Sequence, residues 1–159
     1  MNIERIEIGF TTCVIIGSFR KHFDQIKDVI MYFEDNNIIV LSPQNSNITT
    51  DSINDEFIIL ESDNIYGENK QIKYIESVVL DKIEQSSFIY LYNPGGYVGL
   101  SAAFEIGYAY RCSKDIFAAY DTTDVLISQF ISSILSPYQM AQKAGELYGE
   151  RCLSVNNNR

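Results

Sequence analysis

The sequence predicts an α/β protein in which a mostly parallel sheet is covered by helices on both faces. Two observations lead to this class. Short, continuous apolar runs are typical of strands that are buried on both sides, and here they alternate along the chain with longer stretches whose apolar residues recur at helical spacing. The length of 159 residues allows one compact domain, which we expect at residues 1–153, with residues 154–159 as a disordered tail.

The first half of the chain contains three predicted strands and two predicted helices. Residues 11–16 (TTCVII) form the first strand, which ends at a glycine. Apolar residues at helical spacing, with charged residues between them, predict an amphipathic helix over 19–33. Residues 38–41 predict a second strand, residues 57–60 a third strand after a polar loop, and residues 72–83 another helix.

The second half continues the alternation. Residues 88–92 (FIYLY) predict a buried strand that an Asn-Pro-Gly-Gly turn ends sharply. A helix is expected over 100–112, a strand over 116–119 and a helix over 124–135. Pro137 can open one more helix, since proline is tolerated in a first helical turn. The predicted sheet therefore has five strands.

Charge and composition exclude several functional classes. Lysine and arginine total 12 against 21 aspartates and glutamates, a net charge of −9, which argues against nucleic-acid binding because that binding depends on many cationic contacts to phosphate. No apolar run approaches the ~18 residues of a membrane span, and the first residues lack the features of a signal peptide. Three cysteines without a CxxC pair and one histidine indicate no metal site. We expect a cytoplasmic protein with reduced thiols.

Ligands of parallel α/β sheets bind beyond the carboxyl ends of the strands, which directs attention to the loops at 17–20, 41–46 and 93–101. In the first loop, Gly17 permits a tight turn, and the Ser18 hydroxyl, the following helix amides and Arg20 or Lys21 would suit an anion. Ser18 is equally well explained as a plain helix N-cap. GxGxxG and P-loop motifs are both absent, so neither a dinucleotide fold nor a P-loop NTPase is supported.

The third loop is unusually rich in glycine, which brings the backbone close to whatever binds there. Glu105 follows one turn inside the next helix, with Ser101 and Tyr108 on its face. Near a helix amino terminus the dipole is expected to keep a carboxylate ionised, so that it can act as a nucleophile or a hydrogen-bond acceptor. Alternatively, Glu105 is only a favourable charge at a helix start, although its apolar neighbours Phe104 and Ile106 weaken that interpretation.

Two segments carry a resemblance to a known family. The run YLYNPGGYVGLSAAFEIGYAYRCSKDIF and the earlier VIIGSFR resemble the nucleoside 2-deoxyribosyltransferase superfamily, which includes the 2'-deoxynucleoside 5'-monophosphate N-glycosidases. The resemblance extends from about Cys13 to Tyr120. It implies a flavodoxin-like, Rossmann-like three-layer domain, an enzyme that cleaves or exchanges the N-glycosidic bond of a small-molecule nucleoside or nucleotide, and no cofactor.

The resemblance also assigns residues. Glu105 in the sequence FEIG matches the catalytic nucleophile, and Gly99 and Ser101 match the stretch beside the sugar and the phosphate. Ser18 and Arg20 match phosphate-contacting residues of the nucleotide branch. The complete predicted substrate site is Gly17, Ser18, Phe19, Arg20, Asn93, Gly96, Gly99, Ser101 and Tyr108.

The resemblance further implies a homodimer or a higher oligomer, because family members complete their sites with residues of a neighbouring chain. Tyr120 and Asp121, after the last predicted strand, are the candidates for that contribution. The apolar and aromatic carboxyl-terminal third, DVLISQFISSIL with Tyr138 and Tyr148, also favours an interface. The alternative is that these segments only pack on their own sheet.

One departure from the family pattern leaves the general acid unassigned. The family's aspartate, about 15 residues before the end of the strand at 88–92, falls at Val78, with Glu76 and Asp81 as the nearest acids. The strand is also followed by Asn93 where the family has an acid. Two hypotheses therefore stand: an N-glycosidic enzyme, or a nucleotide-binding or sensing module that has lost efficient chemistry. A two-component receiver domain is disfavoured, because the first strand ends without an acidic cluster.

Overall fold

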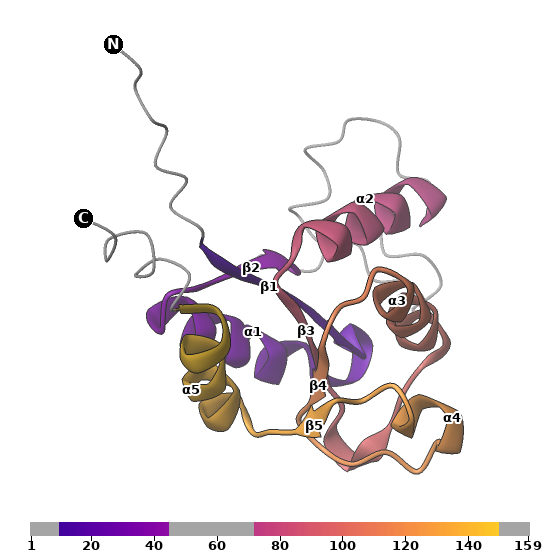
Figure 1. Cartoon of the computed structure of the whole chain (residues 1–159). Helices are drawn as coiled ribbons and strands as arrows, with labels where there is room; N and C mark the ends of the chain where they lie inside the picture. The colour runs from indigo at the N-terminus through magenta and orange to yellow at the C-terminus, as the bar shows by residue number, and fades with distance from the viewer. Residues whose placement is uncertain (1–9, 45–71, 150–159) are drawn as a thin grey trace, which may run out of the picture.

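A computed structural model describes residues 10–44 and 72–149. Within these ranges the chain forms a five-stranded, all-parallel sheet in the order β2-β1-β3-β4-β5, with helices on both faces (Figure 1). The fold is flavodoxin-like, as the sequence predicts. In chain order the elements are β1 Thr11–Gly17, α1 Phe19–Asp35, β2 Ile38–Ser42, α2 Ile72–Gln85, β3 Phe88–Tyr92, the 3-10 turn η2 Pro94–Gly96, α3 Leu100–Arg111, β4 Ile116–Ala118, α4 Val125–Ser128, β5 Ser133–Ile134 and α5 Pro137–Tyr148.

Each face of the sheet has its own apolar core, because successive side chains of a strand point to opposite faces. Phe88 and Tyr90 of β3 pack with α1 and α5, whereas Ile89 and Leu91 pack with α2 and α3. Figure 1 shows the same arrangement of three layers. The largest buried side chain, Tyr90, also donates a hydrogen bond of 2.8 Å to the Leu135 carbonyl.

Four of the predicted strands are confirmed as β1 to β4, and the predicted strand at residues 57–60 lies outside the described residues. The prediction of one helix over residues 124–135 is wrong. The Asp124 carboxylate accepts a bond from the Ile127 amide and caps a single helical turn, α4. The chain then runs beside β4, where the Ser132 and Leu135 amides donate to the carbonyls of Ile116 and Ala118. Pairing with a distant strand thus overrides the local helical pattern.

The two cysteines in the described residues are unpaired: Cys13 is buried in the core, and Cys112 is partly buried at the end of α3. Burial raises the pKa of the Cys13 thiol, which makes this thiol a core side chain and not a reactive one. Across the same residues, no helix combines the length and apolar character that a membrane span requires.

Candidate functional site

The loops after β1 and β3 meet at the carboxyl edge of the sheet, where sequence analysis places the site. Gly17 at the end of β1 pairs with Tyr92 at the end of β3. A Cβ atom on Gly17 would lie 2.7 Å from the Tyr92 carbonyl oxygen, closer than any side chain tolerates. A glycine at position 17 therefore lets the two loops approach one another.

The first turn of α1 is separated from the rest of that helix. The Ser18 carbonyl accepts bonds from the amides of Lys21 and His22, at 3.1 and 2.9 Å, and His22 has non-helical φ and ψ of −133° and 27°. Ser18 occupies the N-cap position, but its side chain caps no amide of the described helix, so plain capping does not explain this serine. Arg20 and Lys21 are exposed beside it, and Phe19 packs against the core.

Lys21 connects this turn to the glycine-rich loop. Its ammonium nitrogen lies 3.5 Å from the centre of the Tyr97 ring, a cation–π contact. Gly99 also lies beside that tyrosine: a Cβ atom at Gly99 would be 3.5 Å from the Tyr97 hydroxyl. The predicted anion-binding turn and the predicted sugar-binding stretch are thus neighbours. Sequence analysis did not identify Tyr97, whose only signal was its position inside the glycine-rich run.

Asn93 and Gly96 hold the glycine-rich turn against the loop that follows β4. The buried Asn93 side chain donates to the Tyr120 carbonyl at 2.9 Å and accepts from the Tyr120 amide at 3.0 Å. Gly96 has a φ of +76°, and its carbonyl accepts a 3.0 Å bond from the Thr122 hydroxyl. Both residues were predicted to bind substrate, and the contacts that they make are with their own chain.

Glu105 lies in the second turn of α3, partly buried, and its carboxyl group interacts with that of Glu76 on α2. Burial, the Glu76 charge and a hydrogen bond to Glu76 raise the pKa of Glu105 well above its ordinary value. The expectation that the helix dipole keeps Glu105 ionised is therefore wrong for the ligand-free protein, because burial and a neighbouring carboxylate outweigh the dipole.

Glu76 completes a carboxyl pair. Burial raises the pKa of Glu76, while the hydrogen bond from Glu105 opposes that rise. Two carboxyl groups that interact this closely are harder to ionise together, so the pair favours sharing one proton. The Glu76 Oε1 atom is buried and has no hydrogen-bond partner among the described residues, so this carboxyl group retains an unused acceptor.

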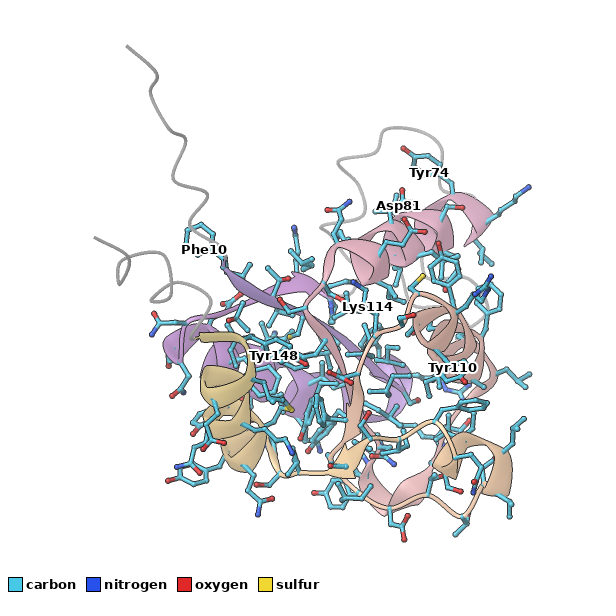
Figure 2. The ribbon with its side chains drawn as sticks, viewed as in Figure 1. Phe10, Tyr74, Asp81, Tyr110, Lys114 and Tyr148 are labelled. Atoms are coloured by element: carbon cyan, nitrogen blue, oxygen red, sulfur yellow. The ribbon has the colours of Figure 1, made fainter. Side chains whose placement is uncertain are left out.

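The two candidate acids of α2 are separated by the geometry of that helix. Glu76 lies three and seven residues before Val79 and Ile83, which both pack in the core, so it shares their face. Asp81 lies on the exposed surface of α2 (Figure 2). Of the acids near the expected position, Glu76 is therefore the one beside Glu105.

Of the other predicted residues, one is exposed near this edge and three make contacts within their own chain. Ser101 is exposed in the first turn of α3. The Tyr108 hydroxyl donates a hydrogen bond to the Glu84 carboxylate of α2. The exposed Tyr120 ring packs edge-on against Tyr92, with 6.2 Å between ring centres. The Asp121 carboxylate accepts a bond from the next amide in its own loop.

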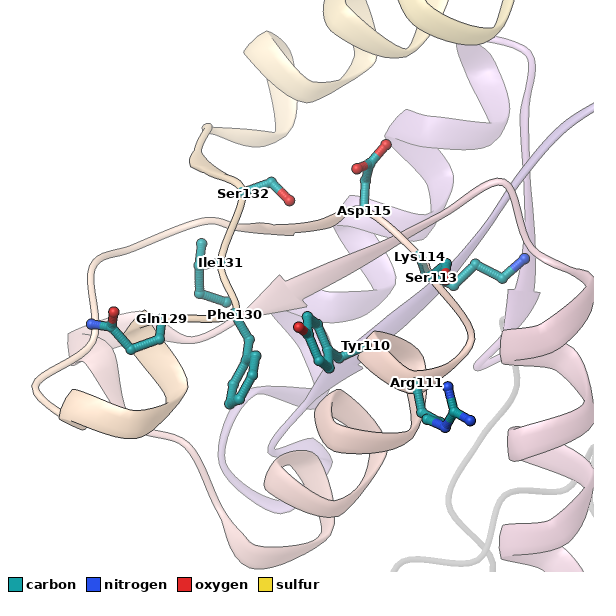
Figure 3. Close-up of a pocket in the computed structure, with 9 residues that line it drawn as sticks. All are labelled: Tyr110, Arg111, Ser113, Lys114, Asp115, Gln129, Phe130, Ile131 and Ser132. Atoms are coloured by element: carbon teal, nitrogen blue, oxygen red, sulfur yellow. The ribbon is translucent and has the colours of Figure 1, made fainter.

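A cavity of about 530 Å³ lies away from this site, between the end of α3 and the segment before β5 (Figure 3). Its lining includes residues 113–115, which directly precede β4 and therefore lie at the amino edge of the sheet. Two of its polar side chains already have partners, since Lys114 donates to the Glu84 and Ser86 carbonyls and Asp115 accepts from Tyr148. None of the predicted site residues lines it.

No group of histidine, cysteine, aspartate and glutamate side chains in the described ranges is arranged to hold a metal ion. Comparison with protein-family models finds no match, and no curated protein matches the sequence. Among solved structures, a CMP N-glycosidase of Clostridium botulinum, BcmB, has a similar fold: the match has a TM-score of 0.51 and 18% sequence identity, and covers 87% of this chain and 99% of that chain.

Proposed function

We propose that this protein cleaves the N-glycosidic bond of a nucleoside 5'-monophosphate or a nucleoside, with Glu105 as the nucleophile and Glu76 as its acid partner. The observation that carries the proposal is the pair of partly buried carboxyl groups of Glu76 on α2 and Glu105 on α3, which interact with one another. Glycosidic bond cleavage requires two carboxyl groups in different protonation states. A pair that holds one proton meets that requirement.

The reaction follows from moving that proton. When Glu105 transfers it to Glu76, the Glu105 carboxylate attacks the anomeric carbon, and the Glu76 carboxylic acid protonates the departing base. The carbon–nitrogen bond breaks as the carbon–oxygen bond forms, and the base leaves with the electron pair and the proton. Water then attacks the anomeric carbon, transfers a proton to Glu76 and releases Glu105. If a second base replaces water, the same steps transfer the sugar.

The carboxyl edge of the sheet offers a place for a phosphate. Ser18 has a hydroxyl that caps no amide of α1, Arg20 and Lys21 supply positive charge, and the first turn of α1 begins directly after β1. Amides of a helix start and nearby cations together favour phosphate binding. Gly99 and Ser101, at the start of α3, are the proposed contacts to the sugar.

Two further lines of support come from the sequence and from the fold. The sequence motifs GSFR and FEIG resemble the nucleoside 2-deoxyribosyltransferase superfamily, and a protein with a similar fold is a CMP N-glycosidase. We therefore place the chain in this superfamily as part of the proposal. The acidic charge and the unpaired Cys13 and Cys112 of the described residues fit a cytoplasmic enzyme, and the resemblance implies no cofactor.

The test is release of free base, measured by chromatography over the common nucleosides, deoxynucleosides and their 5'-monophosphates. We expect release by the wild type and none by Glu105→Gln, because the amide is nearly isosteric but is not an anionic nucleophile. Glu146→Gln, which changes an exposed glutamate of α5 in the same way, is the matched control and should keep full activity. Half of wild-type turnover in Glu105→Gln would overturn the assignment.

A nucleotide-binding or sensing module is the second candidate. It is favoured by Asn93, which stands where the family has an acid and whose side chain is bonded to the Tyr120 backbone. Calorimetric binding of a nucleotide by the wild type, without any base release, would select this candidate over the enzyme.

We also propose a homodimer in which Tyr120 and Asp121 reach the ligand of the neighbouring chain. Apolar side chains that are more than half exposed gather on α3 and α4, namely Leu100, Phe104, Val125 and Leu126, and such surfaces usually mark interfaces. Light scattering after size exclusion should give about twice the monomer mass of 18.1 kDa. A monomer mass that persists with nucleotide present would refute the shared site.

A further inference from the structure

Helices α2 and α3 are joined by two contacts between polar side chains. The first is the interaction between the Glu76 and Glu105 carboxyl groups, and the second is the hydrogen bond from the Tyr108 hydroxyl to the Glu84 carboxylate. Glu76 and Glu84 are eight residues apart, about 12 Å along the axis of α2. Because both contacts follow the same order along the two helices, they define how far α2 is shifted along α3 and how it is rotated.

The carboxyl end of α2 is anchored by a third side chain. The Lys114 ammonium donates to the carbonyls of Glu84 and Ser86, at 2.7 Å each, and so binds the helix end where carbonyls lack helical partners. The Ser87 amide donates a 2.9 Å bond to Thr12 of β1 just beyond. These bonds are to the backbone of the last turn of α2 and of the residues just after it, and they fix the carboxyl end of the helix.

The Glu84 side chain bonds to α3 and therefore resists rotation of α2, together with the apolar packing of Val79 and Ile83. A rotation by one residue position, 100°, would carry Glu76 off the face that meets α3. The bond between a tyrosine hydroxyl and a carboxylate is charge-assisted, and the hydrogen bond to Glu84, followed by burial, raises the pKa of Tyr108 to about 12. This tyrosine therefore remains a protonated donor throughout the neutral range.

We propose that Tyr108 and Glu84 are positioning residues that hold α2 in the rotation at which Glu76 meets Glu105. The effect of this positioning on catalysis rests on the proposed function, because Glu76 and Glu105 are the proposed catalytic pair. Tyr108 thereby acquires a role other than the substrate contact that the sequence predicts: it touches α2, and acts through Glu84 and Glu76.

The groups around the carboxyl pair allow the position of Glu76 to be followed through the titration of Glu105. The β1 and β3 side chains that share its core are apolar: Val14, Ile16, Ile89 and Leu91. Polar groups near the other end of the helix pair include Glu84, Lys114 and Cys112, which also interacts with Tyr108, and the last turns of α2 and α3 carry Lys82 and Arg111. Burial is the largest cause of the raised pKa of Glu105, and Glu76 is the next, so the proton affinity of Glu105 falls if Glu76 moves away.

The test is a titration of the Glu105 side-chain carboxyl by carbon-13 NMR in the ligand-free protein, for Tyr108→Phe and the wild type. We expect Glu105 to bind its proton about threefold more weakly in Tyr108→Phe, because a less firmly held Glu76 raises the proton affinity less. Tyr110→Phe makes the same chemical change two residues away, where the ring contacts Phe130. This control should titrate like the wild type.

A second pair of variants separates positioning from a general loss of structure. Glu84→Gln keeps an oxygen that accepts the Tyr108 bond and should retain the wild-type titration, whereas Glu84→Ala should reproduce Tyr108→Phe. An unchanged Glu105 titration in both Tyr108→Phe and Glu84→Ala would overturn the inference. Because the titration needs no substrate, it stands even if the wild type releases no base, and that separate result would refute only the proposed function.

Discussion

Substitution of Gly96 by alanine tests how the glycine-rich turn is held in place. Gly96 has a φ of +76°, in the left-handed region, and an added Cβ would lie 2.6 Å from the Asp121 carbonyl oxygen and 3.4 Å from the Thr122 Cα. Both neighbours are backbone atoms, so relief requires movement of the turn or of the loop after β4. Gly95 next to it has a φ of +69° but no atom within 4 Å of its Cβ position.

Comparison of Gly95→Ala with Gly96→Ala separates the cost of a left-handed backbone from the cost of a crowded methyl group. A left-handed conformation costs an alanine about 1–2 kcal/mol, and both variants carry that term. Forcing an extra methyl group into packed structure costs about 1–3 kcal/mol more, and only Gly96→Ala carries this second term. The lower entropy of the unfolded chain after a glycine-to-alanine change is common to both variants and cancels in the comparison. We expect losses of about 1–2 kcal/mol for Gly95→Ala and about 2–5 kcal/mol for Gly96→Ala.

The measurement is urea unfolding followed by circular dichroism, with the free energy of unfolding extrapolated to water and the slopes compared. Equal losses in the two variants would show that the close approach of Gly96 to Asp121 does not constrain the turn. A larger loss in Gly95→Ala than in Gly96→Ala would contradict the packing that we describe.

Three further predictions concern the same edge of the sheet. Asn93→Leu leaves the Tyr120 amide and carbonyl without their partner and should reduce the free energy of unfolding by about 2–4 kcal/mol; a loss below about 1 kcal/mol would show that water replaces the amide. Arg20→Ala should weaken a nucleoside monophosphate by about 10- to 100-fold in calorimetry and the corresponding nucleoside little, since the charge-assisted contact needs the phosphate; equal weakening would remove Arg20 from the phosphate site. Burial raises the pKa of Glu105, so the folded wild type binds this proton more tightly than the unfolded chain. Its contribution to stability is fully present below the ordinary carboxyl pKa and declines as pH rises through the raised pKa. The stability of Glu105→Gln relative to the wild type should therefore increase from pH 4 to pH 8, and a difference that stays constant with pH would contradict the burial.

Local sequence patterns determined most of the fold. The apolar runs at 11–16 and 88–92 lie in β1 and β3, two of the three interior strands, because a strand that is covered on both faces needs mostly apolar side chains. The helical spacing from Phe19 to Phe33 matches α1 for the same kind of reason, since its buried face repeats with the helical period. Burial of a strand or of a helix face requires a local pattern of apolar residues, so these elements could be predicted from the sequence.

The tertiary structure decided what the local patterns could not. Residues 132–135 run beside β4 because amides there bond to a strand more than a dozen residues away. The local sequence pattern does not identify that pairing strand. The same holds for the candidate site. Glu105 was identified from its motif, but its partner Glu76, and with it the direction in which its pKa moves, follows from how α2 is rotated against α3. Contacts between side chains of elements that are distant in sequence depend on three-dimensional packing. The periodicity of apolar residues along the chain does not encode these contacts.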